Sequence, residues 1–181
     1  MDNFEIQLLT QNWIDNSTDD GRDFCSHGQV QLIINGIVLC NENSGDWTVA
    51  SSALGLMKSA IYGYDSKTDF ELIPCCGYLR IFPSCPRCMT WDTKINDNVI
   101  VISNIQCSEV EKDKLKSISS KLEIPYMKYA MQVLNFANKI IRFYSSSISR
   151  KFDDKWDKEQ YELFWKEFNE YHQILVEKCS K

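Results

Sequence analysis

The stretch Ile73–Trp91 holds four of the eight cysteines and three of the four prolines, so its composition is the best suited to special chemistry. Within it, Cys85 and Cys88 form a C-x-x-C pair, which can provide half of a tetrahedral zinc site from one tight turn. The nearest further thiols are Cys75 and Cys76. Neighbouring residues of a strand point to opposite faces, so only one of these two is expected to ligate unless the glycine turn after them redirects both.

A zinc site in this chain would draw its ligands from two segments. Cys76, Cys85 and Cys88 come from the cysteine-rich stretch, and Cys25 and His27 are further candidates because residues two apart on a strand share a face. The same Cys25–His27 spacing also allows nucleophilic catalysis. A structural hydrogen bond from His27 to the backbone is the more ordinary expectation. The cofactor prediction is therefore either none or zinc.

Two other interpretations of the cysteines compete with zinc. The C-P-x-C pattern of Cys85 and Cys88 resembles the active site of glutaredoxins, but that chemistry needs a helix N-terminus after the motif to lower the pKa of the first thiol. Met89–Ile95 alternates in polarity and predicts a strand instead. In the simplest interpretation the cysteines pack as small hydrophobic residues, which suits Cys40 and Cys107.

The elements that must position these residues are predicted from periodicity and turn signals. Asn35-Gly36 is the preferred pair for a type I′ hairpin, and it divides Gln29–Cys40 into two strands. Thr48 is expected to cap a helix and Pro125 to begin another. The predicted strands are Phe4–Leu8, Phe70–Ile73, Tyr78–Phe82, Met89–Ile95, Val99–Ile105 and Lys116–Ile124, and the predicted helices are Trp47–Tyr62, Pro125 to Ser145–Ser147, and a last one from Asp157 with a capping box to Gln160.

Strands come first and long helices last, which predicts an α+β class. We expect an antiparallel sheet of about six strands with three main helices packed on it, the two longest at the C-terminal end. A chain of 181 residues without a repeat or linker favours one α+β domain over residues 1–181.

Charge and composition limit the classes of function. Residues 1–90 contain 11 acidic and 5 basic side chains, and the whole chain has a net charge of −5, which disfavours nucleic-acid binding. The sequence shows no apolar run of membrane length and no basic n-region of a signal peptide, so a cytoplasmic protein without a membrane partner is expected. It also lacks a phosphate-binding glycine loop, H-E-x-x-H and G-x-S-x-G, which argues against an enzyme.

Several short motifs lie along most of the chain, namely Phe4-x-Ile6, Cys25-Ser26-His27-Gly28, Trp47-Thr48-Val49, Pro74-Cys75-Cys76-Gly77, Cys85, Trp91, Phe136-Ala137 through Phe143-Tyr144, and Phe164-Trp165. Together they resemble a family of small bacterial cytosolic proteins without an assigned enzyme activity. Tyr78 stands where the family pattern often has His, and Cys88 is particular to this chain.

The size, acidity and aromatic-rich helical end are also similar to immunity proteins of bacterial toxin systems, including contact-dependent inhibition. That resemblance implies a non-enzymatic partner: a cognate toxin domain, with basic nucleases among the candidates. An acidic face would steer such a partner and exposed aromatic residues would anchor it. The predicted partner-binding residues are Asp15, Asp19, Asp20, Asp23, Trp13 and Trp156.

Overall fold

The structure is a computed structural model that describes residues 4–14, 18–80, 87–108, 116–118 and 121–180. The strands in this part of the chain are β1 (Phe4–Leu8), β2 (His27–Gly28), β3 (Val30–Ile34), β4 (Ile37–Cys40), β5 (Trp47–Thr48), β6 (Ile73–Pro74), β7 (Cys88–Asn96), β8 (Val99–Ser108), β9 (Lys116–Ile118) and β10 (Leu122–Pro125). The helices are α1 (Val49–Ile61), α2 (Tyr126–Ser145) and α3 (Lys155–Cys179).

The strands of the described residues form three antiparallel sheets. β1, β3 and β4 make one sheet, β10, β8, β7 and β6 make a second with β9 attached to β8, and β2 pairs with β5. The predicted α+β class is confirmed, as are the three helices with the two longest at the C-terminal end. The prediction of one sheet of about six strands is wrong. Side chains of α2 bind the outer edge of β1, so that edge is not open to another strand.

The predicted hairpins are confirmed. Asn35 and Gly36 both have positive φ, 51° and 76°, as a type I′ turn requires, and Ile34 pairs with Ile37 across them. The long pair β7–β8 forms as expected across the turn at Asp97, whose φ is 50°. These turns are specified by the local sequence, because few residues accept positive φ.

Three predicted strands are shorter than expected or divided. Phe70–Ile73 contributes only its last residue to β6, and Pro74, which has no backbone N–H, ends that strand. Tyr78 makes an isolated bridge and a turn follows it, while the rest of Tyr78–Phe82 lies outside the described residues. Lys116–Ile124 is divided into β9 and β10, both of which pair with β8.

Two helix starts also differ from the sequence prediction. α1 begins at Val49 rather than Trp47, because β5 pairs with β2 and Val49 N donates to Ser26 O at 3.0 Å. Thr48 stands at the N-cap position, but its hydroxyl makes no capping hydrogen bond. α3 begins at Lys155, since the carboxylate of Asp154 accepts from Asp157 N at 2.8 Å. Asp157 is therefore in the first turn and is not the cap.

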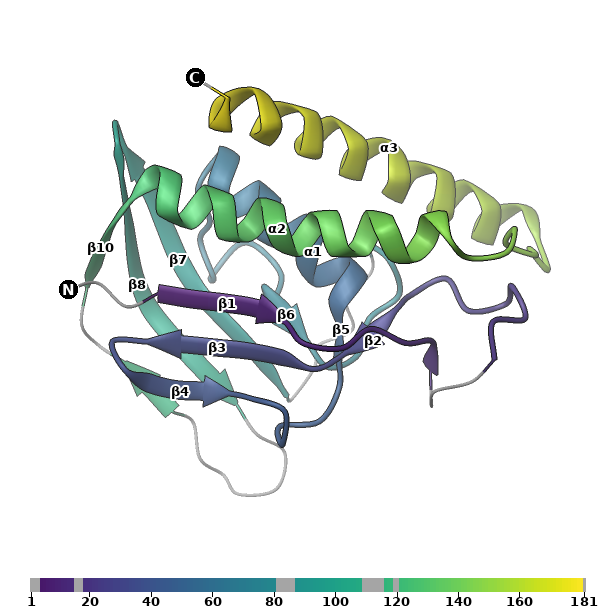
Figure 1. Cartoon of the computed structure of the whole chain (residues 1–181), viewed down its shortest axis with the longest axis horizontal. Helices are drawn as coiled ribbons and strands as arrows, with labels where there is room; N and C mark the ends of the chain where they lie inside the picture. The colour runs from purple at the N-terminus through teal and green to yellow at the C-terminus, as the bar shows by residue number, and fades with distance from the viewer. Residues whose placement is uncertain (1–3, 15–17, 81–86, 109–115, 119–120, 181) are drawn as a thin grey trace.

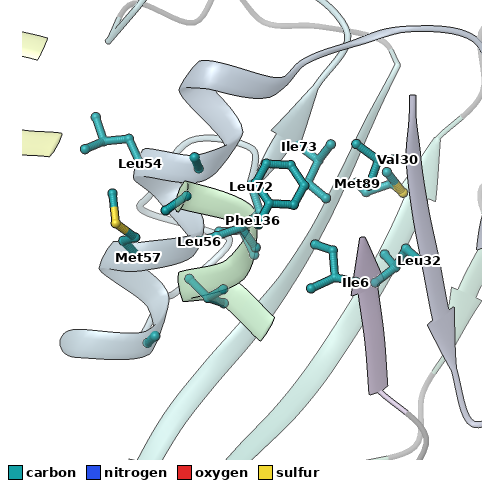
Figure 2. Close-up of a cluster of buried hydrophobic side chains, with 14 of the residues drawn as sticks. Ile6, Val30, Leu32, Leu54, Leu56, Met57, Leu72, Ile73, Met89 and Phe136 are labelled. Carbon is teal, nitrogen blue, oxygen red and sulfur yellow. The ribbon is translucent and has the colours of Figure 1, made fainter. Parts of the chain in front are cut away.

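The helices cover the sheets in a layer, with α2 and α3 running side by side and α1 behind α2 (Figure 1). Apolar side chains from α1, α2, β1, β3 and the β6–β7 edge meet in one core, where Leu56, Phe136 and Met89 are fully buried (Figure 2). Phe4 packs on Trp91 and Tyr129 with ring centroids 5.8 and 4.9 Å away. This core packs β1 against β7 and α2.

Candidate functional site

Two cysteine side chains lie close together directly after β6. The chain bends at Cys75 and Cys76, and this bend brings their Sγ atoms to 3.6 Å of one another. The sequence left open whether a turn at Gly77 redirects both side chains; in the structure the bend lies at Cys75 and Cys76 themselves. Cys76 is exposed and Cys75 is half-buried. Cys88 begins β7 opposite Pro74, and Cys75 N donates to Arg87 O at 3.1 Å.

The five predicted zinc ligands are not gathered into one cluster by the part of the chain that the structure describes. Cys85 lies outside the described residues. Among the described residues no group of three or more His, Cys, Asp or Glu side chains is placed to hold a metal ion. Cys25 accepts a hydrogen bond from Leu79 N at 2.8 Å, so its sulfur is engaged in the core. Zinc binding by this set stays a prediction.

Cys25 and His27 do not have the geometry of a nucleophile and its base. Burial raises the pKa of the Cys25 thiol to about 12, even though the bond from Leu79 N opposes that rise. A thiol with such a pKa stays protonated, whereas a nucleophilic cysteine needs thiolate. The His27 ring makes no hydrogen bond to the described residues, and its Nδ1 is buried. The expected backbone hydrogen bond from this ring is therefore not formed.

The redox interpretation required a helix N-terminus after the C-x-x-C pair. Residue Cys88 is instead the first residue of β7, as the alternation of Met89–Ile95 predicted. A strand carries no aligned dipole to stabilise a thiolate. The described residues after this motif therefore form a strand and not the helix that the redox interpretation needs.

Most of the acidic loop that the sequence proposed for partner binding is used within the fold. Asp19 receives both a hydrogen bond and an ion pair from Arg150 at 2.7 Å. Its burial would raise its pKa, but hydrogen bonds from Arg150, Ile148 N and Gly21 N hold the pKa below the usual value. Asp23 accepts from two backbone N–H groups, those of residues 14 and 25.

Asp20 is the acid of this loop that remains well exposed, and Asp15 lies outside the described residues. Arg22 lies between Asp20 and Asp153, at 3.9 and 3.7 Å. This contact joins the loop to the start of α3, at the right-hand end of the molecule in Figure 1. Asp20 and the neighbourhood of Trp156 therefore belong to one end of the molecule.

The two tryptophans predicted for partner binding have opposite environments. Trp13 is buried, with 6% exposed, and the prediction that it is a surface residue is wrong. The Arg150 guanidinium lies 4.2 Å from its ring, and the Phe143 and Tyr144 rings pack against it at 4.8 and 5.2 Å. Trp156 is 50% exposed, as expected.

Trp156 is held in place by a residue that the sequence did not suggest. Its indole stacks on Tyr78 with centroids 5.8 Å apart and planes at 12°. The Tyr78 hydroxyl donates to Asp157 Oδ1 at 2.5 Å. Burial of the Tyr78 side chain is the larger cause, and the hydrogen bond to this carboxylate the second cause, of a raised pKa of Tyr78. We call Tyr78, Asp153, Asp154, Trp156 and Asp157 the Trp156 patch. No sequence signal links Tyr78 to Trp156, because they are far apart in the chain.

Several hollows of the described surface are lined by polar groups. One of about 600 Å³ contains Asp65, Asp69 and Asp92, and another of about 440 Å³ contains Lys139 and Arg142. The carboxylates of the first are already engaged: Asp69 by Lys58 at 2.6 Å, and Asp92 by Ser66. These carboxylates therefore make structural contacts within the fold.

Comparison of the chain with protein-family models, with curated proteins and with solved structures finds no match. Within the described residues, no helix combines the length and apolarity needed to cross a bilayer.

Proposed function

We propose that this chain is a cytoplasmic, non-enzymatic interaction protein, an immunity protein that binds and neutralises a cognate bacterial toxin domain. The observation that carries the proposal is the half-exposed Trp156, held in one orientation by Tyr78 and flanked by carboxylates. Binding hot spots are enriched in Trp and Tyr, because a rigid ring buries a large area at a small cost in conformational entropy.

The stack on Tyr78 supports an anchoring role for Trp156. A half-exposed indole that exchanges between rotamers would lose conformational entropy when a partner covers it. Here the Tyr78 ring already limits the orientation of the indole, and the bond from its hydroxyl to Asp157 limits the orientation of Tyr78. The anchor is thus preorganised, which favours affinity.

The charges around the anchor favour a basic partner. Asp153 has 83% of its side chain exposed, and Asp154 and Asp20 are exposed nearby, with a single arginine, Arg22, shared between Asp20 and Asp153. The cation next to Trp156, Lys155, is paired with Glu159 at 3.2 Å. Exposed carboxylates steer a positively charged protein and speed its association. Toxin domains that cut nucleic acid present such a basic surface, and the same acidic end would repel nucleic acid itself.

The binding test uses the purified toxin domain encoded beside this protein and measures affinity by calorimetry. Trp156→Ala should weaken binding by about 30-fold or more, the effect of a hot spot of about 2 kcal/mol. Tyr62→Ala is the matched control, because Tyr62 is also an exposed aromatic residue packed on a tyrosine, Tyr171. Equal effects of the two variants, or no binding by the wild-type protein, would overturn the proposal.

The Asp153→Asn variant separates the effect of surface charge on the association rate from the effect of Trp156 on the stability of the complex. Loss of one exposed carboxylate should lower the association rate a few-fold at low salt and leave the dissociation rate nearly unchanged. The difference should shrink at high salt, because surface charges are screened within about 8 Å at physiological ionic strength.

A further inference from the structure

We infer that the hollow between β1 and α2 binds the C-terminal residue of an extended peptide, through the backbone of β1 and the cations Lys139 and Arg142. The hollow measures about 440 Å³, which lies within the usual range of ligand pockets. The described residues that line it include these two basic side chains and no acidic one. Its charge therefore favours a ligand with a negative group.

The outer edge of β1 offers this ligand a carbonyl and an N–H group. Leu9 N donates to Gln29 O at 2.8 Å, so backbone groups with the parity of Leu9 bond β3, and those of the alternate residues point outward. Side chains of α2 bind three of the outward groups. Within the described residues, Ile6 O and Leu8 N make no hydrogen bond. These two groups lie on either side of Gln7 and border the hollow.

The two groups are spaced for one residue of a parallel strand. In parallel pairing, a residue donates its N–H to the carbonyl before the residue opposite it, and its own carbonyl accepts from the N–H after that residue. A ligand residue opposite Gln7 would make both bonds, with Ile6 O and Leu8 N. The Gln132 amide already makes the equivalent pair at the preceding position, with Phe4 O and Ile6 N.

The next position along the edge cannot accept a further residue. Lys139 Nζ donates to Leu8 O at 2.6 Å, and a longer parallel strand would need that carbonyl for its own N–H. With Gln132 on one side and Lys139 on the other, the edge has room for one residue and not for a strand. The bound chain must end or leave the edge after that residue.

The charges beside this position favour a chain that ends there. Arg142 is exposed, lies about one helical turn beyond Lys139 on α2 and lines the same hollow. Among the described residues its guanidinium makes no ion pair. A C-terminal carboxylate could accept from Leu8 N and pair with both cations, and such charge-assisted hydrogen bonds are stronger than neutral ones. An internal peptide residue would leave both cations without an anion.

The test titrates the full-length, isotope-labelled protein with N-acetyl-trialanine that has a free C-terminal carboxylate, followed by NMR. We expect a dissociation constant of about 1 mM and a downfield shift of the Leu8 amide proton as it forms a hydrogen bond. The same peptide with a C-terminal carboxamide should bind at least about tenfold more weakly, because a hydrogen bond to a charged group is lost. Acetate has the carboxylate but no N–H for Ile6 O, so it should also bind more weakly.

Arg142→Gln should weaken binding of the free-carboxylate peptide by about tenfold or more. Lys128→Gln is the matched control, since it removes one positive charge from the same helix at a residue that lines a different hollow. Trp156→Ala should bind this peptide as the wild-type protein does, which separates this site from the proposed toxin-binding surface.

Four results would overturn the inference: equal affinity for the carboxylate and carboxamide peptides, acetate binding as tight as that of the peptide, equal losses in Arg142→Gln and Lys128→Gln, or shifts that leave the Leu8 amide unchanged. A wild-type protein that does not bind the peptide at about 10 mM would refute it as well.

Discussion

The Gln132 side chain binds the backbone around Ile6 in the way that a neighbouring strand would. Its Oε1 accepts from Ile6 N at 2.8 Å and its Nε2 donates to Phe4 O at 2.9 Å. Seven residues further along α2, Lys139 Nζ donates to Leu8 O at 2.6 Å. α2 thereby binds three backbone groups on the outer edge of β1, where the first sheet ends.

Gln132→Ala should destabilise the protein by about 1–3 kcal/mol, the usual cost of leaving hydrogen-bonding groups unpaired. It should also promote aggregation, because an uncovered sheet edge pairs with other chains. Urea denaturation measures the first effect and light scattering the second. Asn135→Ala, an exposed position on the same helix, is the control. A Gln132 variant as stable as the control would refute this role of the side chain.

The Asp19–Arg150 pair should make stability depend on acid pH. The pKa of Asp19 is lower in the folded protein than its ordinary value of 3.8. Its contribution is therefore fully present above that ordinary pKa, and it is lost as the pH falls through the lower folded value. The urea concentration at the unfolding midpoint should therefore decrease as the pH falls through this range, and it should decrease less in the Asp19→Asn variant.

Asp20→Asn provides the control for this pH profile, because Asp20 is more exposed and its Arg22 contact is longer, at 3.9 Å. Exposed ion pairs contribute little to stability. Its profile should follow that of the wild-type protein. Parallel wild-type and Asp19→Asn profiles would contradict the role assigned to the Asp19–Arg150 pair.

The contrast between the two tryptophans predicts losses of stability of different size. Trp13→Ala removes a buried ring and the partner of the Arg150 guanidinium, and should cost about 3–5 kcal/mol. Trp156→Ala removes a half-exposed ring and should cost less than about 1 kcal/mol. Thermal and urea unfolding of both variants check this order, and its reversal would show that the two environments are wrongly described.

The cysteines should differ in reactivity in a predictable order. With a pKa of about 12, the Cys25 thiol is ionised in only about one molecule in ten thousand at about pH 8, and it is also buried. Alkylation of the native protein in the presence of a chelator should label Cys76 first and leave Cys25 unmodified until unfolding. Peptide mass spectrometry locates the label. Rapid labelling of Cys25 would restore the nucleophile hypothesis.

The parts of the fold that follow from short-range chemistry could be predicted from sequence. Asn35-Gly36 specifies its turn because both residues adopt positive φ. The alternation of Met89–Ile95 likewise predicts β7 and excludes a helix after the C-x-x-C pair. The turn preference and the alternation both depend on residues adjacent in the sequence, and contacts with distant parts of the chain do not change either structure.

The parts that depend on distant contacts could not be predicted. Trp13 lies among polar residues in the sequence, so nothing local indicates that Arg150 covers it. Tyr78 meets Trp156 only because the turn after β6 faces the start of α3. The proximity of the Cys75 and Cys76 sulfurs depends on a bend, and an extended chain would have separated them.

Growth of cells that co-express this protein with the toxin domain encoded beside it is the most direct measurement of the proposed function. The wild-type protein and Tyr62→Ala should restore growth, while Trp156→Ala, expressed to the same level, should fail to protect. Full protection by Trp156→Ala would contradict the role of the Trp156 patch. Continued growth arrest with the wild-type protein would contradict the immunity function itself.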